Sequence, residues 1–391
     1  MTENLNYNVL IGIKYEVDLS RFTFYSLLYT SQHQMIAPDM PRSVRTGDEL
    51  DLLRLTIYLH EHVPDMGEVV DVRQFPGGFS NLTYWLKTAH GEYVLRRPPV
   101  GANIKGGHDM GREFRVLSLL KGHYANIPEP IVYCETTDVL GAPFYIMKRI
   151  PGIILRATMA PTLTLAPERM RQLSESLIDN LVAIHRLDIE ATGLVQLGKP
   201  DGYVQRQVAG WIKRYRQAET DKIPAMDQVG DWLQQNYPRD QPPAFLHNDY
   251  KYDNVILAPD ERTGEPTPEI KGVLDWEMAT VGDPLMDLGA TLAYWSEARD
   301  SPAYRNFNLT WLPGNLTRRE VIARYEAQSG RDLTDIVFYY VFGLYKNAVI
   351  AQQIYARWKQ GYSQDARFGH LLPMIIELAT KAAGTVEQQA I

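Results

Sequence analysis

One segment, Phe245 to Leu257, constrains this chain more than any other, because it sets a dense group of polar side chains between two apolar runs. It reads FLHNDYKYDNVIL and carries His247, Asp249 and Asn254 in its middle. Flanks of this kind predict short packed strands, which would bury the polar residues between them. Because an unpaired buried polar group costs about 1–3 kcal/mol, we expect these side chains to meet partners from elsewhere in the chain.

A second segment, Gly272 to Glu277, supplies such a partner. It reads GVLDWE and places Asp275 directly after an apolar strand, 21 residues beyond Asn254. Carboxylates and an amide at strand ends suit a hard divalent cation, since Mg²⁺ takes oxygen ligands and usually retains waters and substrate phosphates. The plainer interpretation, a hydrogen-bonded turn between two strands, is disfavoured once Asp275 is counted with Asn254.

The spacing within the first segment points to phosphoryl transfer. That reaction needs a carboxylate to orient the attacking hydroxyl and accept its proton, an Asn and an Asp on the metal, and cations along the phosphates. The chain has the order and spacing of a kinase catalytic loop in His247-x-Asp249-x-Lys251-x-x-Asn254.

Short runs rich in β-branched and aromatic residues predict a small antiparallel sheet in the first part of the chain. One helix, from about Asp109 to Leu120, interrupts the series. An earlier helix is expected from Thr46, where TGDE has the form of a capping box, and Pro64 would close it. The predicted strands are Val69–Phe75, Leu82–Leu86, Tyr93–Arg96, Ile131–Tyr133 and Phe144–Met147.

After Pro151-Gly152 the pattern becomes mostly helical, so the predicted fold class is α+β with two lobes. We expect an N-terminal extension over residues 1–45, a strand-rich N-lobe over 46–150 and a helical C-lobe over 151–391, with a cleft near the junction. The clearest predicted helices are Met170–His185, Trp211–Arg216, Val321–Gln328 and Ile336–Trp358.

Charge and cysteine content exclude several classes of function. With 40 Lys and Arg against 47 Asp and Glu, the net charge of −7 gives no global field that attracts nucleic acid. The single cysteine, Cys134, favours a reducing compartment, and we expect a buried thiol in a cytoplasmic protein. The apolar run between Asp335 and Lys346 is ten residues long, whereas a bilayer-crossing helix needs roughly 20, so we expect no membrane partner.

Two motifs carry a resemblance to a known family. They are the catalytic-loop segment and the run Leu274 to Leu288, which reads LDWEMATVGDPLMDL. Over roughly residues 67–360 the chain resembles the aminoglycoside phosphotransferase and choline kinase-like family, and it is most similar to the kinase-like domains associated with acyl-CoA dehydrogenases. The resemblance implies a two-lobed protein kinase-like fold with ATP and Mg²⁺ as cofactors.

The resemblance implies a role for each matching residue of the catalytic loop. Asp249 would be the catalytic base, His247 would brace the loop, and Lys251 would neutralise the transferred phosphate. Asn254 and Asp275 would bind Mg²⁺.

Two acidic residues of the second motif would assist. Glu277 would approach the metal through water, and Asp287 would anchor the catalytic loop or a helix terminus. Asp283-Pro284 is typical of a turn.

In the first lobe, Gly77-Gly78-Phe79-Ser80-Asn81 matches the family's nucleotide-covering loop, where glycines let backbone N–H groups approach phosphates. If Val94 faces the adenine, strand alternation favours Arg96 over Arg97 for the phosphate contact. The expected ion-pair partner of Arg96 is Glu113, for which an exposed helix charge is the alternative. The connection between the lobes, Tyr145-Ile146-Met147-Lys148-Arg149, would offer backbone groups to adenine, those of Met147 among them.

The resemblance implies a small-molecule acceptor with a hydroxyl group, and the subgroup suggests a hydroxyacyl-CoA or a hydroxy acid, together with acyl-CoA dehydrogenase association. The alternatives are an aminoglycoside or amino-alcohol kinase and a nucleotide-binding pseudokinase without turnover. ATP versus GTP and the oligomeric state stay open. Four basic residues would meet CoA phosphates or form a solvated helix face: Arg206, Lys213, Arg214 and Arg216.

Two further features are interpreted as structural. His185 lies in an apolar helix and is expected to be a hydrogen-bonded core histidine. The aromatic residues between Phe338 and Tyr345 are expected to form helix core.

Overall fold

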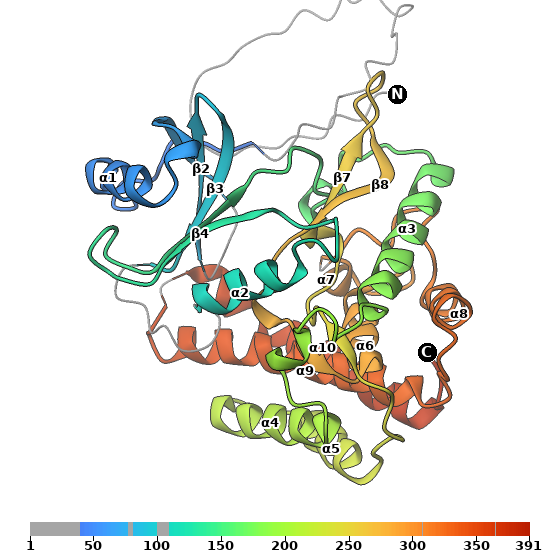
Figure 1. The fold of residues 1–391 in the computed structure, drawn as a ribbon. Coiled ribbons are helices and arrows are strands. Elements are labelled where there is room, and N and C mark those ends of the chain that lie inside the picture. The colour runs from blue at the N-terminus through green and yellow to red at the C-terminus, as the bar shows by residue number, and fades with distance from the viewer. Residues whose placement is uncertain (1–39, 77–80, 100–108, 307, 364) are drawn as a thin grey trace, which may run out of the picture. The chain divides into compact units, whose positions relative to one another are not determined.

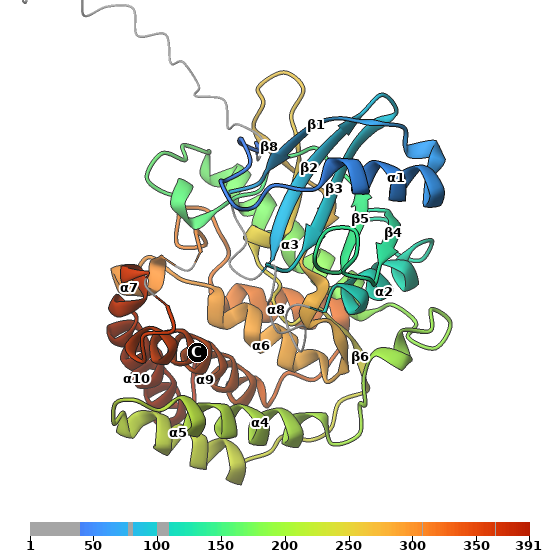
Figure 2. The same ribbon diagram turned by 90° about the vertical axis from the view of Figure 1, so that its left-hand side faces the viewer.

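A computed structural model describes residues 40–76, 81–99, 109–306, 308–363 and 365–391. The chain divides into two units, Met1–Met35 and Ile36–Ile391, and every described residue belongs to the second. In Figures 1 and 2 a sheet and the helices packed on it form one part of this unit, and the remaining helices form the other.

The sheet is antiparallel and has five strands in the order β1-β2-β3-β5-β4. Successive side chains of a strand point to opposite faces of the sheet. In β2 every second residue from Tyr84 to Thr88 is accordingly buried. The strands are β1 (Val69–Gln74), β2 (Leu82–Thr88), β3 (Gly91–Arg97), β4 (Pro130–Cys134) and β5 (Phe144–Lys148).

Each face of the sheet packs against one helix. Helix α1 (Leu52–His62) buries Leu55 and Leu59 in a core with β2, β3 and β5. Helix α2 (Met110–Leu120) belongs to the larger core on the opposite face, which also contains Val94 and Tyr145.

The predicted start of α1 was wrong. The helix begins after Asp51, whose side chain accepts from the Arg54 N–H, and not at Thr46. The TGDE sequence forms a turn instead, in which the Gly47 N–H donates to the Glu49 carboxylate. Gly47 has a φ of 91°, a left-handed conformation that glycine adopts readily and a first helical turn does not contain.

The second part is mostly helical, which confirms the predicted fold class. Two short β ribbons interrupt the helices, one of β6 (Ala244–Leu246) with β9 (Thr280–Gly282) and one of β7 (Val255–Pro259) with β8 (Pro266–Val273). The helices are α3 (Pro167–His185), α4 (Tyr203–Ala218), α5 (Pro224–Gln235), α6 (Pro284–Tyr294), α7 (Pro302–Arg305), α8 (Arg318–Ser329), α9 (Ile336–Lys359) and α10 (Leu372–Gln388).

Helices α6 and α9 form the centre of this part, and both are buried along almost their whole length. Their backbones touch at two glycines. A Cβ atom added to Gly289 would lie 2.2 Å from the Tyr339 carbonyl oxygen, and one added to Gly343 would lie 2.3 Å from the Gly289 carbonyl oxygen. Only glycine at both positions permits this approach.

Helix α9 contains the apolar run that precedes Lys346, and the run is buried as expected. In the part of the chain that the structure describes, no helix combines the length and hydropathy needed to cross a bilayer.

The glycine contact yields a stability prediction. Gly289→Ala is expected to lower the free energy of unfolding by about 1–3 kcal/mol, because the added methyl group must displace backbone atoms of α9. Gly384→Ala in α10 is the matched control, since its Cβ would meet nothing within 4 Å. The control should melt at the wild-type temperature or slightly above it, because alanine favours helix. Equal melting temperatures for the two variants would contradict the close packing.

Candidate functional site

Pairing of β7 with β8 brings the two predicted metal ligands to one place. Val255 pairs with Val273, so the residues just outside this pair, Asn254 and Leu274, are neighbours. The Leu274 N–H donates to the Asn254 carbonyl oxygen over 2.8 Å. Asp275 follows immediately, in a left-handed conformation with a φ of 65° that non-glycine residues adopt rarely.

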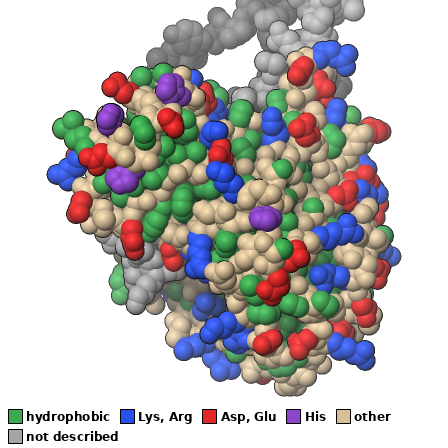
Figure 3. Space-filling view, in the orientation of Figure 1, with side chains coloured by type: hydrophobic (Ala, Val, Ile, Leu, Met, Phe, Trp, Pro, Cys, Tyr) green, Lys and Arg blue, Asp and Glu red, His purple; other side chains and the backbone are tan. Residues whose placement is uncertain are grey.

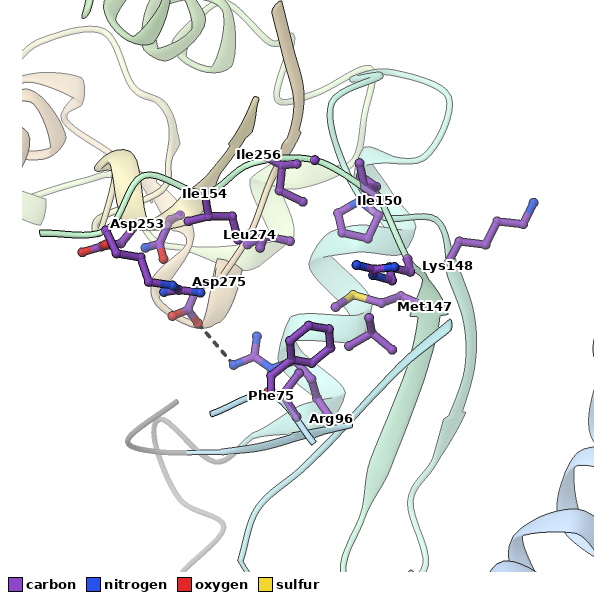
Figure 4. Close-up of a pocket in the computed structure, with 17 residues that line it drawn as sticks. Phe75, Arg96, Met147, Lys148, Ile150, Ile154, Asp253, Ile256, Leu274 and Asp275 are labelled. Atoms are coloured by element: carbon purple, nitrogen blue, oxygen red, sulfur yellow. Dashed lines mark hydrogen bonds and ion pairs between the residues drawn. The ribbon is translucent and has the colours of Figure 1, made fainter. Parts of the chain in front are cut away.

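Asn254 and Asp275 line a pocket between the five-stranded sheet and the helical part, with a volume of about 170 Å³. We call it the central pocket. Figure 4 shows Phe75, Arg96 and Met147 on one side of it and Ile154, Asp253 and Asp275 on the other. Its remaining lining residues are Thr83, Val94, Pro128, Lys148, Arg149, Ile150, Gly152, Arg156, Asn254, Ile256 and Leu274.

The Asp249 carboxylate is held by two neighbours in its own loop. Lys251 Nζ donates to its two oxygens over 2.7 and 2.8 Å, and Asn254 Nδ2 donates to Oδ2 over 2.9 Å. Burial acts to raise the pKa of Asp249, but the charge and hydrogen bonds of Lys251, together with His247 and Lys346, outweigh it and hold the pKa below its usual value. Asp249 is therefore ionised at neutral pH. The Lys251 ammonium also lies over the Tyr294 ring, 4.5 Å from its centroid.

Asp287 fixes the backbone of this loop from α6. Its carboxylate accepts the N–H groups of His247 over 2.6 Å and of Asn248 over 2.8 Å. His185 Nε2 lies 3.1 Å from the same carboxylate, while its Nδ1 lies 2.7 Å from the Tyr325 hydroxyl. His185 is thus the hydrogen-bonded core histidine that the sequence predicts.

Asp283, in the second motif, begins a helix rather than the expected turn. Its side chain accepts the Leu285 N–H, so it is the N-cap of α6, and Pro284 is the first residue of that helix.

His247 connects the catalytic loop to the β8 end. Its Nδ1 accepts the Asp249 N–H over 3.2 Å, and its Nε2 donates to the Leu274 carbonyl oxygen over 2.9 Å. The ring packs on Trp276, and the residue is fully buried. The side chain therefore ties the segments that carry Asp249 and Asp275 to each other.

Arg96 carries the network into the sheet. It forms a hydrogen-bonded ion pair with Glu113 of α2, and its Nη2 lies 3.4 Å from Asp275 Oδ1. The dashed line in Figure 4 marks the second contact. Burial acts to lower the pKa of Arg96. The charge of Glu113 and the other neighbouring acids outweigh burial and hold the pKa well above its usual value. Glu113 is buried, so the alternative interpretation of this residue as an exposed helix charge is wrong.

Arg97 faces the other side of β3. Its guanidinium donates to the Leu140 carbonyl oxygen and the Tyr84 hydroxyl, away from the central pocket. Strand alternation separates the two arginines as the sequence suggests.

Glu277 lies beside this network. Asn81 Nδ2 donates to its Oε2 over 3.3 Å, which links the end of the β1–β2 connection to the helical part. Burial, followed by the charge of Asp275, raises the pKa of Glu277 to about 8. A positive charge bound next to both carboxylates would oppose this shift, because it favours their ionised forms.

The donor set fits a magnesium ion. The Asn254 amide nitrogen is occupied by the backbone oxygen and the carboxylate of Asp249, which leaves Oδ1 for a metal, and the Asp275 carboxylate lines the same pocket. No cluster of three or more His, Cys, Asp or Glu side chains that would hold a metal occurs among the described residues. An amide and one carboxylate suit Mg²⁺ that completes its shell with waters and substrate phosphates.

The connection between the lobes differs from the expectation in one respect. The N–H groups of Lys148 and Arg149 already donate to the carbonyl oxygens of Glu129 and Glu92. Met147 lines the central pocket, but these two donors are not free for a nucleotide base. Lys148 itself is exposed and pairs with Glu129.

Most of the described residues among the predicted site form one connected network from Glu113 to Asp249, whereas Met147 only lines the central pocket and Asn81 contacts Glu277. Gly77, Gly78, Phe79 and Ser80 lie outside the described residues, so their part in the site stays a prediction. Sequence reasoning missed Lys346, whose Nζ donates to the Asn248 carbonyl oxygen over 2.8 Å. The available signal was a single cation within the largely apolar stretch from Ile336 to Ala351.

Comparison with known proteins places this geometry in context. The family model described as phosphotransferase enzyme family matches residues 71–322. Acyl-CoA dehydrogenase family member 11 from Rattus norvegicus is 33% identical over 321 residues, which cover 80% of this chain and 40% of that protein. The chain thus spans less than half the length of this relative.

Solved structures are similar over a larger share of their length. A crystal structure from Ralstonia eutropha JMP134 with the provisional name aminoglycoside phosphotransferase is 30% identical, with a TM-score of 0.73, and the match covers 86% of this chain and 99% of that one. Spectinomycin phosphotransferase, solved with ADP and spectinomycin, shares the fold at a TM-score of 0.53 and 14% identity, over 84% of this chain and 98% of that one.

The Asp287 anchor yields a prediction for stability and pH. Burial alone would raise the pKa of Asp287, but its hydrogen bonds and the histidine charges lower it. A carboxylate with a lowered folded-state pKa stabilises the fold above its unfolded pKa of about 3.9, and this contribution is lost as the pH falls below that value. Asp287→Asn should therefore cost about 2–5 kcal/mol at pH 7.

Thermal unfolding from pH 8 to pH 3 checks this. The difference in melting temperature between wild type and Asp287→Asn should be constant down to about pH 5 and shrink below about pH 4. Asp65→Asn, at an exposed carboxylate, should match wild type throughout. A difference that grows with acidity would contradict the assigned sign.

Proposed function

We propose, since the chain belongs to the phosphotransferase enzyme family, that it transfers the γ-phosphoryl group of ATP to a hydroxyl group of a small molecule. The observation that carries this proposal is the set of contacts around Asp249. One carboxylate, one ammonium and one amide meet in a single loop, and the loop adjoins Asp275 through backbone and His247 contacts. Phosphoryl transfer uses this combination of groups.

The proposed reaction assigns a step to each residue. Asp249 accepts a hydrogen bond from the acceptor hydroxyl and takes its proton as the oxygen bonds to the γ-phosphorus, while the bond to the leaving ADP oxygen breaks. The low pKa of Asp249 makes it a weak base, so the proton moves late in this step. Lys251, now paired with Asp249, would turn to the transferred phosphate.

Mg²⁺, when bound by Asn254 and Asp275, would neutralise charge on the phosphate oxygens. Arg96 lies beside Asp275 and is kept in place by Glu113, which suits a contact with the phosphates. We retain Gly77, Gly78, Phe79, Ser80 and Asn81 as the nucleotide-covering loop. The ADP bound to spectinomycin phosphotransferase supports an adenine nucleotide in the same fold.

For the acceptor we propose a hydroxyacyl-CoA or a hydroxy acid. The support is the name of the relative from Rattus norvegicus, an acyl-CoA dehydrogenase family member. The similarity to this relative also supports a functional association with an acyl-CoA dehydrogenase. The name of the Ralstonia eutropha protein favours a second candidate, an aminoglycoside kinase.

Asp249→Asn tests the proposed base. The variant keeps the shape and the hydrogen bond from Asn254 but cannot accept a proton at neutral pH, so kcat should fall by about 10²- to 10⁴-fold. Consumption of ATP with Mg²⁺ and pooled hydroxyacyl-CoAs, hydroxy acids, aminoglycosides and amino alcohols measures this. ADP binding is the control and should stay at the wild-type value, while the melting temperature should fall only modestly, because Lys251 loses a carboxylate partner but stays over the Tyr294 ring. Binding of nucleotide by wild type without turnover of any acceptor would favour a pseudokinase.

Asp275→Asn tests the proposed metal ligand. Loss of the ligand charge should raise the Mg²⁺ concentration for half-maximal activity by about tenfold or more and reduce turnover at saturation. Titration of activity with Mg²⁺ measures both effects. Glu269→Gln, an exposed change on β8, is the matched control and should titrate as wild type does. An unchanged Mg²⁺ dependence in Asp275→Asn would remove this residue from the metal site.

A further inference from the structure

A second cavity lies on the α4 and α9 side of the catalytic loop and is surrounded by positive charge. It has a volume of about 220 Å³, and we call it the basic pocket. Its cations come from three helices, with Arg112 on α2, Arg214 on α4 and Lys346 on α9. Figure 3 shows Lys and Arg side chains gathered beside a hollow in the region where α2 lies above α4. The other lining residues are Tyr203, Gln207, Trp211, Asn248, Met278, Thr280, Met286 and Phe342.

Described carboxylates offset the charge of these three cations only in part, since Asp249 and Asp287 act on Lys346 from beyond ion-pair distance. No Asp or Glu lines the pocket, and none of Arg112, Arg214 and Lys346 forms an ion pair with a described carboxylate. Lys346 is the most telling, because it is only 3% exposed. A buried ammonium without a paired carboxylate costs free energy that a bound anion would recover. Since the chain as a whole has a net charge of −7, this positive region is a local feature.

The side chains are held in place before any ligand binds. Arg112 Nη2 donates to the carbonyl oxygens of Ala279 and Leu197 over 2.6 and 3.3 Å. The Arg214 guanidinium lies over the Trp211 ring, 4.6 Å from its centroid. Lys346 Nζ is fixed by the Asn248 carbonyl oxygen. A site whose cations are already positioned loses little entropy when it binds an anion.

The basic pocket adjoins the residue assigned as base. Asn248 contributes to its wall and directly precedes Asp249 in the chain. A molecule whose hydroxyl reached Asp249 could therefore place another of its groups among the three cations.

Resting on the proposed function, we propose that the basic pocket binds an anionic group of the phosphate acceptor through Arg112, Arg214 and Lys346. The pocket then selects acceptors by charge. It favours phosphate- or carboxylate-bearing hydroxy compounds and repels aminoglycosides, which are polycations. Arg214 is the specificity-determining residue best suited to mutagenesis, because its side chain is exposed and its contact with a described residue is the one with the Trp211 ring.

Calorimetric titration of the full chain saturated with ADP and Mg²⁺ tests the proposal. The probes are CoA, pantetheine as its counterpart without phosphate, 3-hydroxybutanoate as a carboxylate, and kanamycin as a polycation. We expect binding of CoA or 3-hydroxybutanoate, with no binding of pantetheine or kanamycin. Binding of CoA identifies a phosphate as the anionic group, and binding of 3-hydroxybutanoate alone identifies a carboxylate.

Variants assign the binding to the pocket. Arg214→Ala should weaken binding of the anionic probe by roughly tenfold or more, since a charge-assisted hydrogen bond is lost, and Arg214→Lys should recover part of it. Lys213→Ala is the matched control, because Lys213 carries the same charge one residue away and lines a different surface cavity. It should bind the probe as wild type does.

Three results would overturn the inference. They are the absence of binding by both anionic probes, equal affinities of Arg214→Ala and Lys213→Ala, and tighter binding of kanamycin than of either anion. Each is distinguishable from failure of the proposed function, since ADP and Mg²⁺ binding is measured first on the same samples. If wild type does not bind ADP, the proposed function fails; if it binds ADP and one of the three results follows, only the anion site fails.

Discussion

The structure of the site depends on one buried carboxylate. Asp287 accepts two consecutive backbone N–H groups, those of His247 and Asn248, and so fixes the direction in which the chain leaves β6. Asn248 then turns in a left-handed conformation with a φ of 65°, which asparagine tolerates better than most residues. The position of Asp249 follows from this turn. Helix α6 thus determines where the proposed base lies, although it contributes no side chain to the central pocket.

Much of the site could be predicted from the sequence because its residues stand at the ends of short strands. Pairing of Val255 with Val273 then brings Asn254 and Asp275 together without further assumptions. Arg96 followed from the alternation of β3, which is a strong rule in a regular strand.

Other features depend on tertiary contacts, and their local sequence signals were weak or misleading. Thr46 resembled a helix cap, but Asp51 has this role because Leu55 and Leu59 must face the sheet. Lys346 stood out only as a cation in an apolar helix, and its contact with Asn248 joins residues 98 positions apart. The engaged N–H groups of Lys148 and Arg149 depend on carbonyl oxygens from distant strands, which no pattern along the sequence reveals.

The glycine contact between α6 and α9 also has a consequence for catalysis. Gly289 lies two residues after Asp287, and Gly343 lies three residues before Lys346. The distance between the two helix backbones therefore sets the distance between the Asp287 carboxylate and the Lys346 ammonium. Both groups contact the same short stretch, His247 to Asn248. A side chain that forced the α6 and α9 backbones apart would therefore move Asp287 and Lys346 away from each other and shift this stretch. Two glycines outside the central pocket would thereby help to align Asp249, the proposed base.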